Sequence, residues 1–328
     1  MENNLTGKQI LLLYAKFFNY DKIVYNKLKE LGAKVDLYDA RAELSSYEKA
    51  FLKIYKVFFY KKLSIYHHGI IEAQKDCQYD YIFTNSYLPE DTINEYKQNF
   101  PNAIFILYMD DSVNNTPNIE KTFRLYDSVK TFDRSDSLKY NIKLQPLFFE
   151  DSYADINTNI RFSYDVCFIG TVHSDRLKII LEIDRVCREK GLKFYHYCYL
   201  QSRFIYYFYY LTKKEFRLVP KSFFRFKQIP TSEIAIIFSL SQAILDIQHP
   251  LQTGLTMRTI ETIGAGKKLI TTNHDIKNYD IYNENNICLI DRTSSSVEDG
   301  FLKSTYIPLD KDLRYKYSLE GWIYSIFN

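Results

Sequence analysis

The sequence predicts an α/β protein with two parallel sheets, each covered by helices on both faces. Its 328 residues exceed the usual size of one domain, about 100 to 200 residues. Short apolar runs alternate with helix-length segments, which favours parallel strands joined by helical crossovers. The alternation stops at a polar stretch near residue 155 and then starts again. We therefore expect two domains of similar size and similar architecture.

The first half opens as strand, helix and strand. The apolar run KQILLLYA is the first strand, and a helical stretch then ends at Gly32, because glycine readily adopts the left-handed conformation that ends helices. The second strand is KVDLYDA. Further strands are predicted at 79–85, 103–111, 128–133 and 144–150.

The second half repeats this order, beginning with the strand YDVCFIGT, a helix and the strand LKFYHYCYL. Later elements are strands at 243–248, 267–273 and 286–292 and a final helix at 312–328. We expect an N-terminal domain of residues 1–155 and a C-terminal domain of residues 156–310. A C-terminal helix in residues 311–328 then packs back on the first domain.

Composition excludes several classes of protein. The hydrophobic and charged fractions, 46% and 25%, are those of a soluble globular protein, and a net charge of +3 does not indicate nucleic-acid binding. Five scattered cysteines without a CxxC pair suggest neither disulfides nor zinc. With no apolar run of about 18 residues, we expect a cytoplasmic protein. The 17% aromatic content favours surfaces that bind sugars, bases or lipid headgroups.

A loop and helix with the sequence QTGLTMRTIETIGAG follow a predicted strand. Ligands bind at the carboxyl ends of strands in open parallel sheets. Gly254 gives the loop backbone freedom, and either Thr253 or Thr256 can cap the helix, whose free amides suit a phosphate. Arg258 and Glu261 lie one turn apart beside the buried stripe of this helix.

A surface ion pair of little energetic value is the alternative interpretation of Arg258 and Glu261. A second strand, loop and helix, CFIGTVHSDRLK, favours the phosphate site instead. There Gly170 and Thr171 end a strand, and Arg176 begins a helix. Each loop alone is a weak signal, but together they predict a site for a phosphorylated ligand.

These motifs resemble bacterial glycosyltransferases of the GT-B fold that build capsule and lipopolysaccharide, some of which transfer galactofuranose. DVCFIGT and GLTMRTIETIGAGKKLITTN carry the resemblance in the second half, and ILYMDDS, TFDRSDSLKYN and LQPLFFE carry it in the first. The resemblance implies two Rossmann-like domains facing each other across a cleft. It also implies metal-independent hexosyl transfer from a nucleotide sugar, most often a UDP-sugar, without a cofactor.

The resemblance further implies that the donor lies on the second domain. Glu261 would then bind the ribose hydroxyls, and Arg258 would neutralise the diphosphate with the amides near Gly254 and Thr256. Retaining enzymes of this fold often carry two glutamates eight positions apart, whereas the residue eight before Glu261 is Thr253. The stereochemical outcome is therefore left open.

An inverting transfer needs a general base beside the acceptor hydroxyl. Asp110 and Asp111 end one predicted strand, and Asp133 and Asp136 follow the next. Two adjacent carboxylates repel one another, which can raise the pKa of one of them. The aspartates could also cap turns or helices. We favour Asp111 or Asp110 over Asp133 as the catalytic base.

Three other polar features also have both a functional and a structural interpretation. His249, and less so His173, could bind a phosphate or the transferred sugar, although a loop histidine is often structural. The only Asp-x-Asp motif, DKD at 310–312, caps the final helix in our interpretation, and no metal site is predicted.

Two stretches combine bases with aromatic residues, at 47–68 and 204–227. They are either ordinary charged faces or surfaces for an anionic membrane. We expect a glycosyltransferase on the inner face of the cell membrane that elongates a lipid-linked surface glycan. The alternative is a non-catalytic GT-B-like protein that holds a nucleotide or a partner. A nucleic-acid binder is disfavoured, because the donor-like loops would then have no purpose.

Overall fold

The computed structural model describes residues 5–17, 19–42, 56–154, 156, 161–293, 297–298 and 300–328. The chain divides into two compact units. Unit 1 contains Met1–Pro146 and Leu319–Asn328, and unit 2 contains Leu147–Ser318. The division falls at Pro146, whereas the polar stretch in the sequence suggested a position near residue 155.

Six parallel strands form the sheet of unit 1 in the order β2-β1-β3-β4-β5-β6. They are β1 (Gln9–Leu13), β2 (Lys34–Tyr38), β3 (Tyr81–Thr84), β4 (Ile104–Met109), β5 (Ser128–Thr131) and β6 (Lys143–Leu144). The sequence predicted a strand over 144–150, but β6 ends at Leu144. Pro146 has no amide hydrogen for a sheet, and the chain passes into unit 2 after it.

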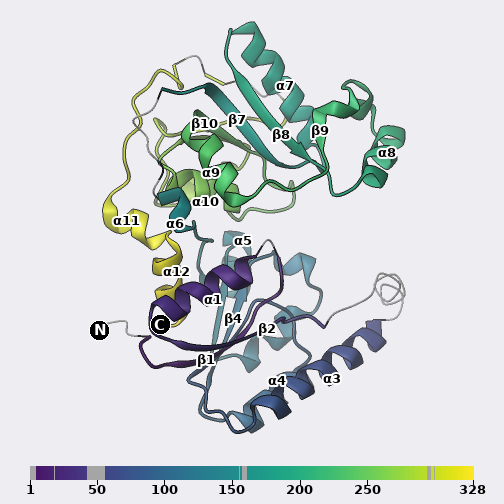
Figure 1. Cartoon of the computed structure of the whole chain (residues 1–328), viewed down its shortest axis with the longest axis vertical. Helices are drawn as coiled ribbons and strands as arrows, with labels where there is room; N and C mark the ends of the chain where they lie inside the picture. Colours follow the sequence, from purple (N-terminus) through teal and green to yellow (C-terminus); the bar gives the residue numbers. More distant parts are fainter. Residues whose placement is uncertain are drawn as a thin grey trace. The chain divides into compact units, whose positions relative to one another are not determined.

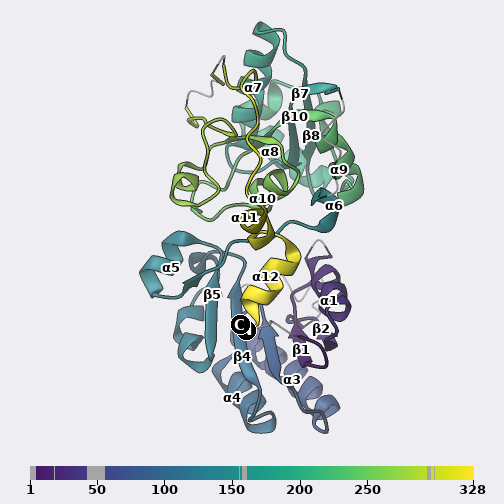
Figure 2. The same ribbon diagram turned by 90° about the vertical axis from the view of Figure 1, so that its left-hand side faces the viewer.

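Helices cover both faces of this sheet, as Figures 1 and 2 show. The helices of unit 1 are α1 (Tyr20–Glu30), α3 (Lys56–Gln74), α4 (Glu90–Asn99), α5 (Arg134–Tyr140) and α12 (Leu319–Ile326). Leu11 of β1 packs in one cluster with Ile71 of α3 and Ile93 of α4. On α12, the Trp322 ring makes edge contacts with the rings of Phe83 and Tyr108.

The C-terminal end of α12 is held by a buried lysine. Lys130 Nζ donates to the carbonyl oxygen of Ile326 at 2.8 Å and also to that of Ser325. A cation at this end satisfies carbonyls that have no partner within the helix. Burial lowers the pKa of Lys130 to about 8.

The sheet of unit 2 also has six parallel strands, in the order β12-β11-β10-β7-β8-β9. They are β7 (Tyr164–Thr171), β8 (Phe194–Tyr199), β9 (Phe224–Arg225), β10 (Ser241–Asp246), β11 (Lys268–Thr271) and β12 (Ile287–Leu289). The strand order reverses between β7 and β10, and the crevice at such a switch point is the usual ligand site of an open parallel sheet.

The helices of unit 2 position the loops of this crevice. They are α6 (Asp151–Ala154), α7 (Arg176–Glu189), α8 (Arg203–Thr212), α9 (Thr231–Ser239), α10 (Met257–Gly264) and α11 (Lys311–Lys316), with the 3-10 turns η3 (Lys214–Arg217), η4 (Lys221–Phe223) and η5 (His274–Asn278). Ile180 and Ile183 of α7 pack on Val166 and Phe168 of β7. Figure 1 shows α9 and α10 below β10, away from α7.

The prediction of one final helix over 312–328 is wrong. The structure has two helices, α11 and α12, and the chain between them makes a sheet-like contact instead. The amide of Phe149 donates to the carbonyl oxygen of Tyr317 at 3.0 Å, and Phe149 forms a parallel bridge with Ser318. This contact uses a backbone carbonyl that a continuous helix would have needed.

Candidate functional site

Three loops at one edge of the unit 2 sheet carry most of the predicted donor residues. Because β7, β8 and β10 are parallel, their carboxyl ends lie at the same edge. Gly170 and Thr171 end β7, and His249 lies in the loop that follows β10. The structure thus brings together residues that are about eighty positions apart in the sequence.

Arg176 begins α7, and its guanidinium group lies against the end of β7. Its Nη1 donates to the carbonyl oxygen of Thr171 at 2.9 Å. A Cβ atom at Gly170 would lie 3.1 Å from the ring of Phe168, which is a tight contact, and 3.8 Å from this nitrogen, which is an ordinary one. Nε of Arg176 is buried and has no hydrogen-bond partner among the described residues. It is a donor that a ligand could satisfy.

Two more guanidinium groups lie near Arg176. Burial is the largest cause that lowers the pKa of Arg176; the charges of Arg258 and Arg292 lower it further, and that of Asp246 opposes them. Three arginines, from the start of α7, from α10 and from the segment after β12, therefore lie near one another at the carboxyl end of this sheet.

Arg292, which the sequence analysis did not single out, holds these loops together. Its Nη1 lies 2.8 Å from both carboxylate oxygens of Asp175, at the start of α7. Its Nη2 donates to the carbonyl oxygen of Gln248 at 2.7 Å, in the loop after β10. One side chain from the segment after β12 thus fixes the loops after β7 and β10.

Asp246, the last residue of β10, was also missed. It is buried, and its Oδ2 accepts from the hydroxyls of Thr256 at 2.9 Å and Thr259 at 2.7 Å. These bonds attach the first turn of α10 to the end of the strand. The acidic residue at a strand end before a threonine-rich helix start was the available signal.

The loop before α10 has the predicted cap. Thr256 is the N-cap residue of α10, and its hydroxyl accepts from the amide of Thr259. Thr253 does not cap the helix. The side chain of Asn273 donates instead to the carbonyl oxygens of Thr253 and Gly254, at 3.0 and 3.2 Å, and so fixes the loop.

Arg258 and Glu261 do form the i,i+3 ion pair that the sequence allowed, with Nη1 and Oε2 2.6 Å apart. The pair does not lie at the surface, because the two side chains are only 17% and 6% exposed. Arg258 also stacks on Phe238 of α9, with its guanidinium carbon 5.0 Å from the ring centre. A buried charge pair of this kind is fixed in position and can orient a ligand.

A second carboxyl group, Glu150, lies close to Glu261. Burial raises the pKa of Glu150 to about 7, with a further contribution from the charge of Glu261. Burial also raises the pKa of Glu261, while Arg258 and the Tyr153 hydroxyl oppose that rise. No local sequence pattern links these two glutamates, because they are more than a hundred positions apart.

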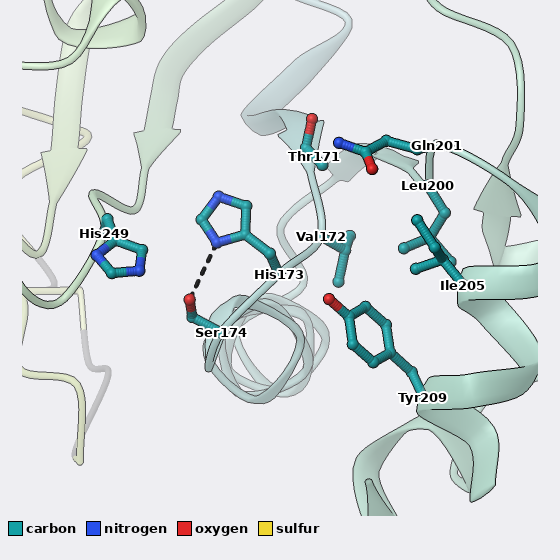
Figure 3. Close-up of a pocket in the computed structure, with 9 residues that line it drawn as sticks. All are labelled: Thr171, Val172, His173, Ser174, Leu200, Gln201, Ile205, Tyr209 and His249. Atoms are coloured by element: carbon teal, nitrogen blue, oxygen red, sulfur yellow. Dashed lines mark hydrogen bonds between the residues drawn. The ribbon is translucent and has the colours of Figure 1, made fainter. Parts of the chain in front are cut away.

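The two loop histidines line a pocket of about 410 Å³. Figure 3 shows that His173 points towards His249, and their ring centres are 5.8 Å apart. The remaining lining residues are Thr171, Val172, Ser174, Leu200, Gln201, Ile205 and Tyr209. Burial and the nearby charge of Arg176 lower the pKa of His173 to about 4, so this ring is neutral at neutral pH. The pocket offers neutral hydrogen-bonding groups beside the arginine cluster.

In unit 1, Asp110 lies at the carboxyl ends of β1, β3 and β4. Asn85 Nδ2 donates to Asp110 Oδ2 at 2.7 Å, and Asn85 Oδ1 accepts from the amide of Ala15 at 2.7 Å. Burial raises the pKa of Asp110 to about 6, and the neighbouring charge of Asp111 adds to this rise. Such a carboxyl group can accept a proton near neutral pH.

The other three aspartates accept hydrogen bonds from backbone amides, and Asp133 and Asp136 also join the start of α5 to the loop after β4. Asp111 is exposed and accepts from the amide of Ser112 and the side chain of Asn115, both at 2.8 Å. Asp133 caps α5, and Asp136 accepts from the amide of Val113 at 2.7 Å. The geometry therefore separates Asp110 from Asp111, which the sequence could not do.

The DKD motif has the capping role that we predicted, since Asp310 accepts from the amides of Asp312 and Leu313 at the start of α11. Within the described ranges, no group of three or more His, Cys, Asp or Glu side chains is arranged to hold a metal ion. Nor does the part of the chain that the structure describes contain a helix long and apolar enough to cross a membrane.

The two basic aromatic stretches differ in structure. Residues 47–55 of the first lie outside the described residues, and the rest belongs to α3, where His67 is buried between Tyr96 and Ala40. The second stretch is not one amphipathic helix. It contains α8, η3, η4 and β9. β9 is the edge strand beside β8, and α8 lies beyond it in Figure 1.

Comparison with known proteins identifies the fold. No family model matches the sequence, and no curated protein matches it. Solved structures do match over nearly the whole chain. One is HepE from Anabaena in complex with UDP and glucose, with a TM-score of 0.60 and 9% identity over 97% of this chain and 98% of that one.

Two further solved structures are similar to this chain over nearly its whole length. An alpha-glucosyltransferase in complex with UDP and DNA has a TM-score of 0.53 and 12% identity, over 97% of this chain and 94% of its own. The lipopolysaccharide outer core galactosyltransferase WaaB has a TM-score of 0.51 and 10% identity, over 98% and 96%. With its two parallel six-stranded sheets, the chain has the α/β architecture of GT-B glycosyltransferases, as predicted.

Proposed function

We propose that this chain is a glycosyltransferase that moves a hexosyl group from a nucleotide sugar, in the first instance a UDP-sugar, to a growing surface glycan. We place the acceptor on a lipid carrier at the inner face of the cell membrane, in capsule or lipopolysaccharide synthesis. The arginine cluster of unit 2 carries this proposal, because a diphosphate is the ligand that three converging guanidinium groups suit best.

The donor diphosphate is assigned to the crevice formed by the loops after β7 and β10. Arg176 offers its unsatisfied Nε, and Arg258 lies within the same cluster. The first amides of α10 add a positive dipole end. Glu261 accepts the ribose hydroxyls in this assignment, and His249 faces the sugar or a phosphate from the pocket beside it.

The acceptor reaction is assigned to Asp110. The acceptor oxygen forms a bond to the anomeric carbon while the bond from that carbon to the diphosphate breaks, and the nucleoside diphosphate leaves. In an inverting transfer the acceptor proton goes to a carboxylate. Asp110 suits this role better than Asp111, because its pKa lies near 6 and Asp111 is held in a local turn.

No cofactor or divalent cation is part of the proposed reaction. The charge that a metal ion would neutralise on the leaving diphosphate is met by Arg176 and Arg258. Transfer that persists in excess EDTA supports this part of the proposal, and loss of transfer that Mg²⁺ or Mn²⁺ restores contradicts it.

A binding and transfer assay tests the whole proposal. Thermal shifts are measured with UDP, GDP, UDP-glucose, UDP-galactose and UDP-galactofuranose, because a ligand of the folded state raises the melting temperature by mass action. We expect a shift with UDP and its sugars that Arg176→Ala removes. Arg185→Ala is the matched control, since Arg185 lies on the same helix in an exposed pair with Glu189.

Release of UDP from the best ligand, with and without a lipid-linked glycan acceptor, then tests transfer. Binding without turnover on any acceptor would favour the alternative, a GT-B-like protein that holds a nucleotide but transfers nothing. No shift with any nucleotide would overturn the assignment of the donor site.

A further inference from the structure

We propose that α8 docks the protein on anionic membrane by inserting its outer apolar stripe, formed by Phe204, Tyr207, Phe208 and Leu211, among the lipid headgroups. The inference extends the membrane location in the proposed function. It can be tested separately, because vesicle binding needs neither donor nor acceptor.

The stripe has helical spacing but faces away from the protein. Its residues are at positions i, i+3, i+4 and i+7, which lie on one face of a helix. In an ordinary surface helix this face is buried, yet Phe204 is 80% exposed, Phe208 is 55% exposed and Leu211 is 73% exposed. Leu218, just after η3, adds another exposed apolar side chain.

The inner face of α8 attaches the helix to the rest of unit 2. Tyr206 is buried with its ring centre 5.5 Å from that of Phe224 in β9. Tyr209 lies 5.0 Å from Phe216, which in turn stacks on Phe224 at 5.1 Å. The helix therefore contacts the core through its inner aromatic side chains, and the exposed stripe is additional to this contact.

The C-terminal end of α8 is also fixed. The guanidinium group of Arg217 donates to the carbonyl oxygens of Tyr210 at 2.9 Å and Leu211 at 2.7 Å. Lys213 Nζ donates to the carbonyl oxygen of Ser174 at 2.7 Å. The stripe is therefore presented on a rigid element, so the cost of ordering it on docking is small.

The charge around the stripe selects the partner. The sequence from 203 to 227 contains one acidic residue, Glu215, and seven basic ones. The basic residues are Arg203, Lys213, Lys214, Arg217, Lys221, Arg225 and Lys227. Bases close in the chain to exposed aromatic and aliphatic side chains suit the boundary between anionic headgroups and acyl chains. A second copy of the chain fits less well, because two such basic rims would repel each other.

Co-sedimentation with vesicles is the first test, using equal parts of phosphatidylglycerol and phosphatidylcholine, and phosphatidylcholine alone. The wild-type protein should bind the anionic vesicles and be released by salt. The variant Phe204→Ser/Phe208→Ser/Leu211→Ser should bind at least about 30-fold more weakly, because each large apolar side chain loses its transfer into lipid.

A control variant replaces three apolar side chains that are exposed outside both basic aromatic stretches, as Leu138→Ser/Ile236→Ser/Ile307→Ser, and should bind like wild type. Removing bases by Arg203→Glu/Lys214→Glu/Lys227→Glu should weaken binding by about fivefold or more for each charge. This variant keeps Arg217 and Lys213, which hold α8 in place.

Tryptophan fluorescence can measure separately how deeply α8 inserts into the bilayer. Trp322, the chain's single tryptophan, is buried in unit 1, so a Phe208→Trp variant adds one exposed reporter. Its emission should shift to the blue on anionic vesicles and be quenched by lipids brominated near the headgroup end of the acyl chain.

Three results would overturn the proposal. One is wild-type protein that stays in the supernatant with anionic vesicles at low salt. Another is a stripe variant that binds as tightly as wild type. The third is a dimer that the stripe variant dissociates while neither protein binds vesicles, which would make the stripe a contact between two copies.

Discussion

Arg258 and Glu261 form an ion pair, 2.6 Å between Nη1 and Oε2, in which both side chains are largely buried. At the surface such a pair would contribute little, but a buried pair leaves an uncompensated charge when one partner is removed. In the proposed donor site the same guanidinium group also meets the diphosphate. Binding and local stability are therefore linked at α10, and the experiments must separate them.

Glu261→Gln should weaken nucleotide-sugar binding by about 10- to 150-fold, because an amide accepts the ribose hydroxyls less well than a carboxylate does. Titration calorimetry measures the affinity, and a melting curve without ligand reports the separate loss of stability. The control is Glu233→Gln, at an exposed position of α9. Unchanged donor affinity in a folded Glu261→Gln protein would remove Glu261 from the site.

Arg258→Ala should lower the turnover number as well as donor affinity. Negative charge grows on the diphosphate as the bond to the sugar breaks, so a cation contributes most in the transition state. The rate at saturating donor is the measurement. Arg188→Ala removes an exposed arginine of α7 and should leave the rate unchanged, whereas full turnover in the Arg258 variant would refute the role.

Local sequence patterns predicted the strands and helices of the site better than the side-chain hydrogen bonds that join its loops. β7 spans the predicted residues, and α7 is the helix predicted between β7 and β8, within about 175–190, because strand and helix periodicity are properties of neighbouring residues. Asn273 and Arg292 could not be found in this way, and Asp246 was missed although its place at a strand end was a signal. Each acts on backbone or hydroxyl groups that folding brings near from another part of the chain.

Burial was the other quantity that the sequence could not supply. The three-residue spacing predicted that Arg258 and Glu261 would meet, but their burial depends on α6, which packs against α10, and on the Phe238 ring of α9, on which Arg258 stacks. The same holds for the stretch containing α8. Composition indicated bases and aromatic rings, and only the fold shows that Tyr206 faces the core while Phe204 faces solvent.

Asp110→Asn should abolish transfer and leave donor binding nearly unchanged, since a positioned general base contributes about 100- to 10,000-fold. Asp111→Asn is the matched control and should keep most of the activity. Wild-type transfer should fall as the pH drops through about 6, the raised pKa of Asp110, because the base must be unprotonated. Normal activity in the Asp110 variant would place the base elsewhere.

Asp110→Asn should also change the pH dependence of stability. The folded-state pKa is raised from 3.8 to about 6, so stability that is present below pH 3.8 is lost as the pH rises through 6. The asparagine variant lacks this loss and should be more stable than wild type by about 1 to 3 kcal/mol at pH 7.5. Urea unfolding at pH 7.5 and pH 4 measures the difference, which should largely disappear at the lower pH.

Gly264→Ala should destabilise α10, because a Cβ atom at this position would lie 2.3 Å from Cγ of Phe149 and within 2.7 Å of both adjacent ring carbons. The ring is fully buried and cannot move aside, so we expect a loss of at least about 1 to 3 kcal/mol. Hydrogen exchange of the amides of 257–264 reports the local effect, and donor affinity should fall with it.

The control is Gly69→Ala in α3, where a Cβ atom meets nothing within 4 Å, and this variant should be neutral or stabilising. If the clash is the cause, Phe149→Ala combined with Gly264→Ala should be no less stable than Phe149→Ala alone; losses that simply add would mean that the glycine is needed for another reason.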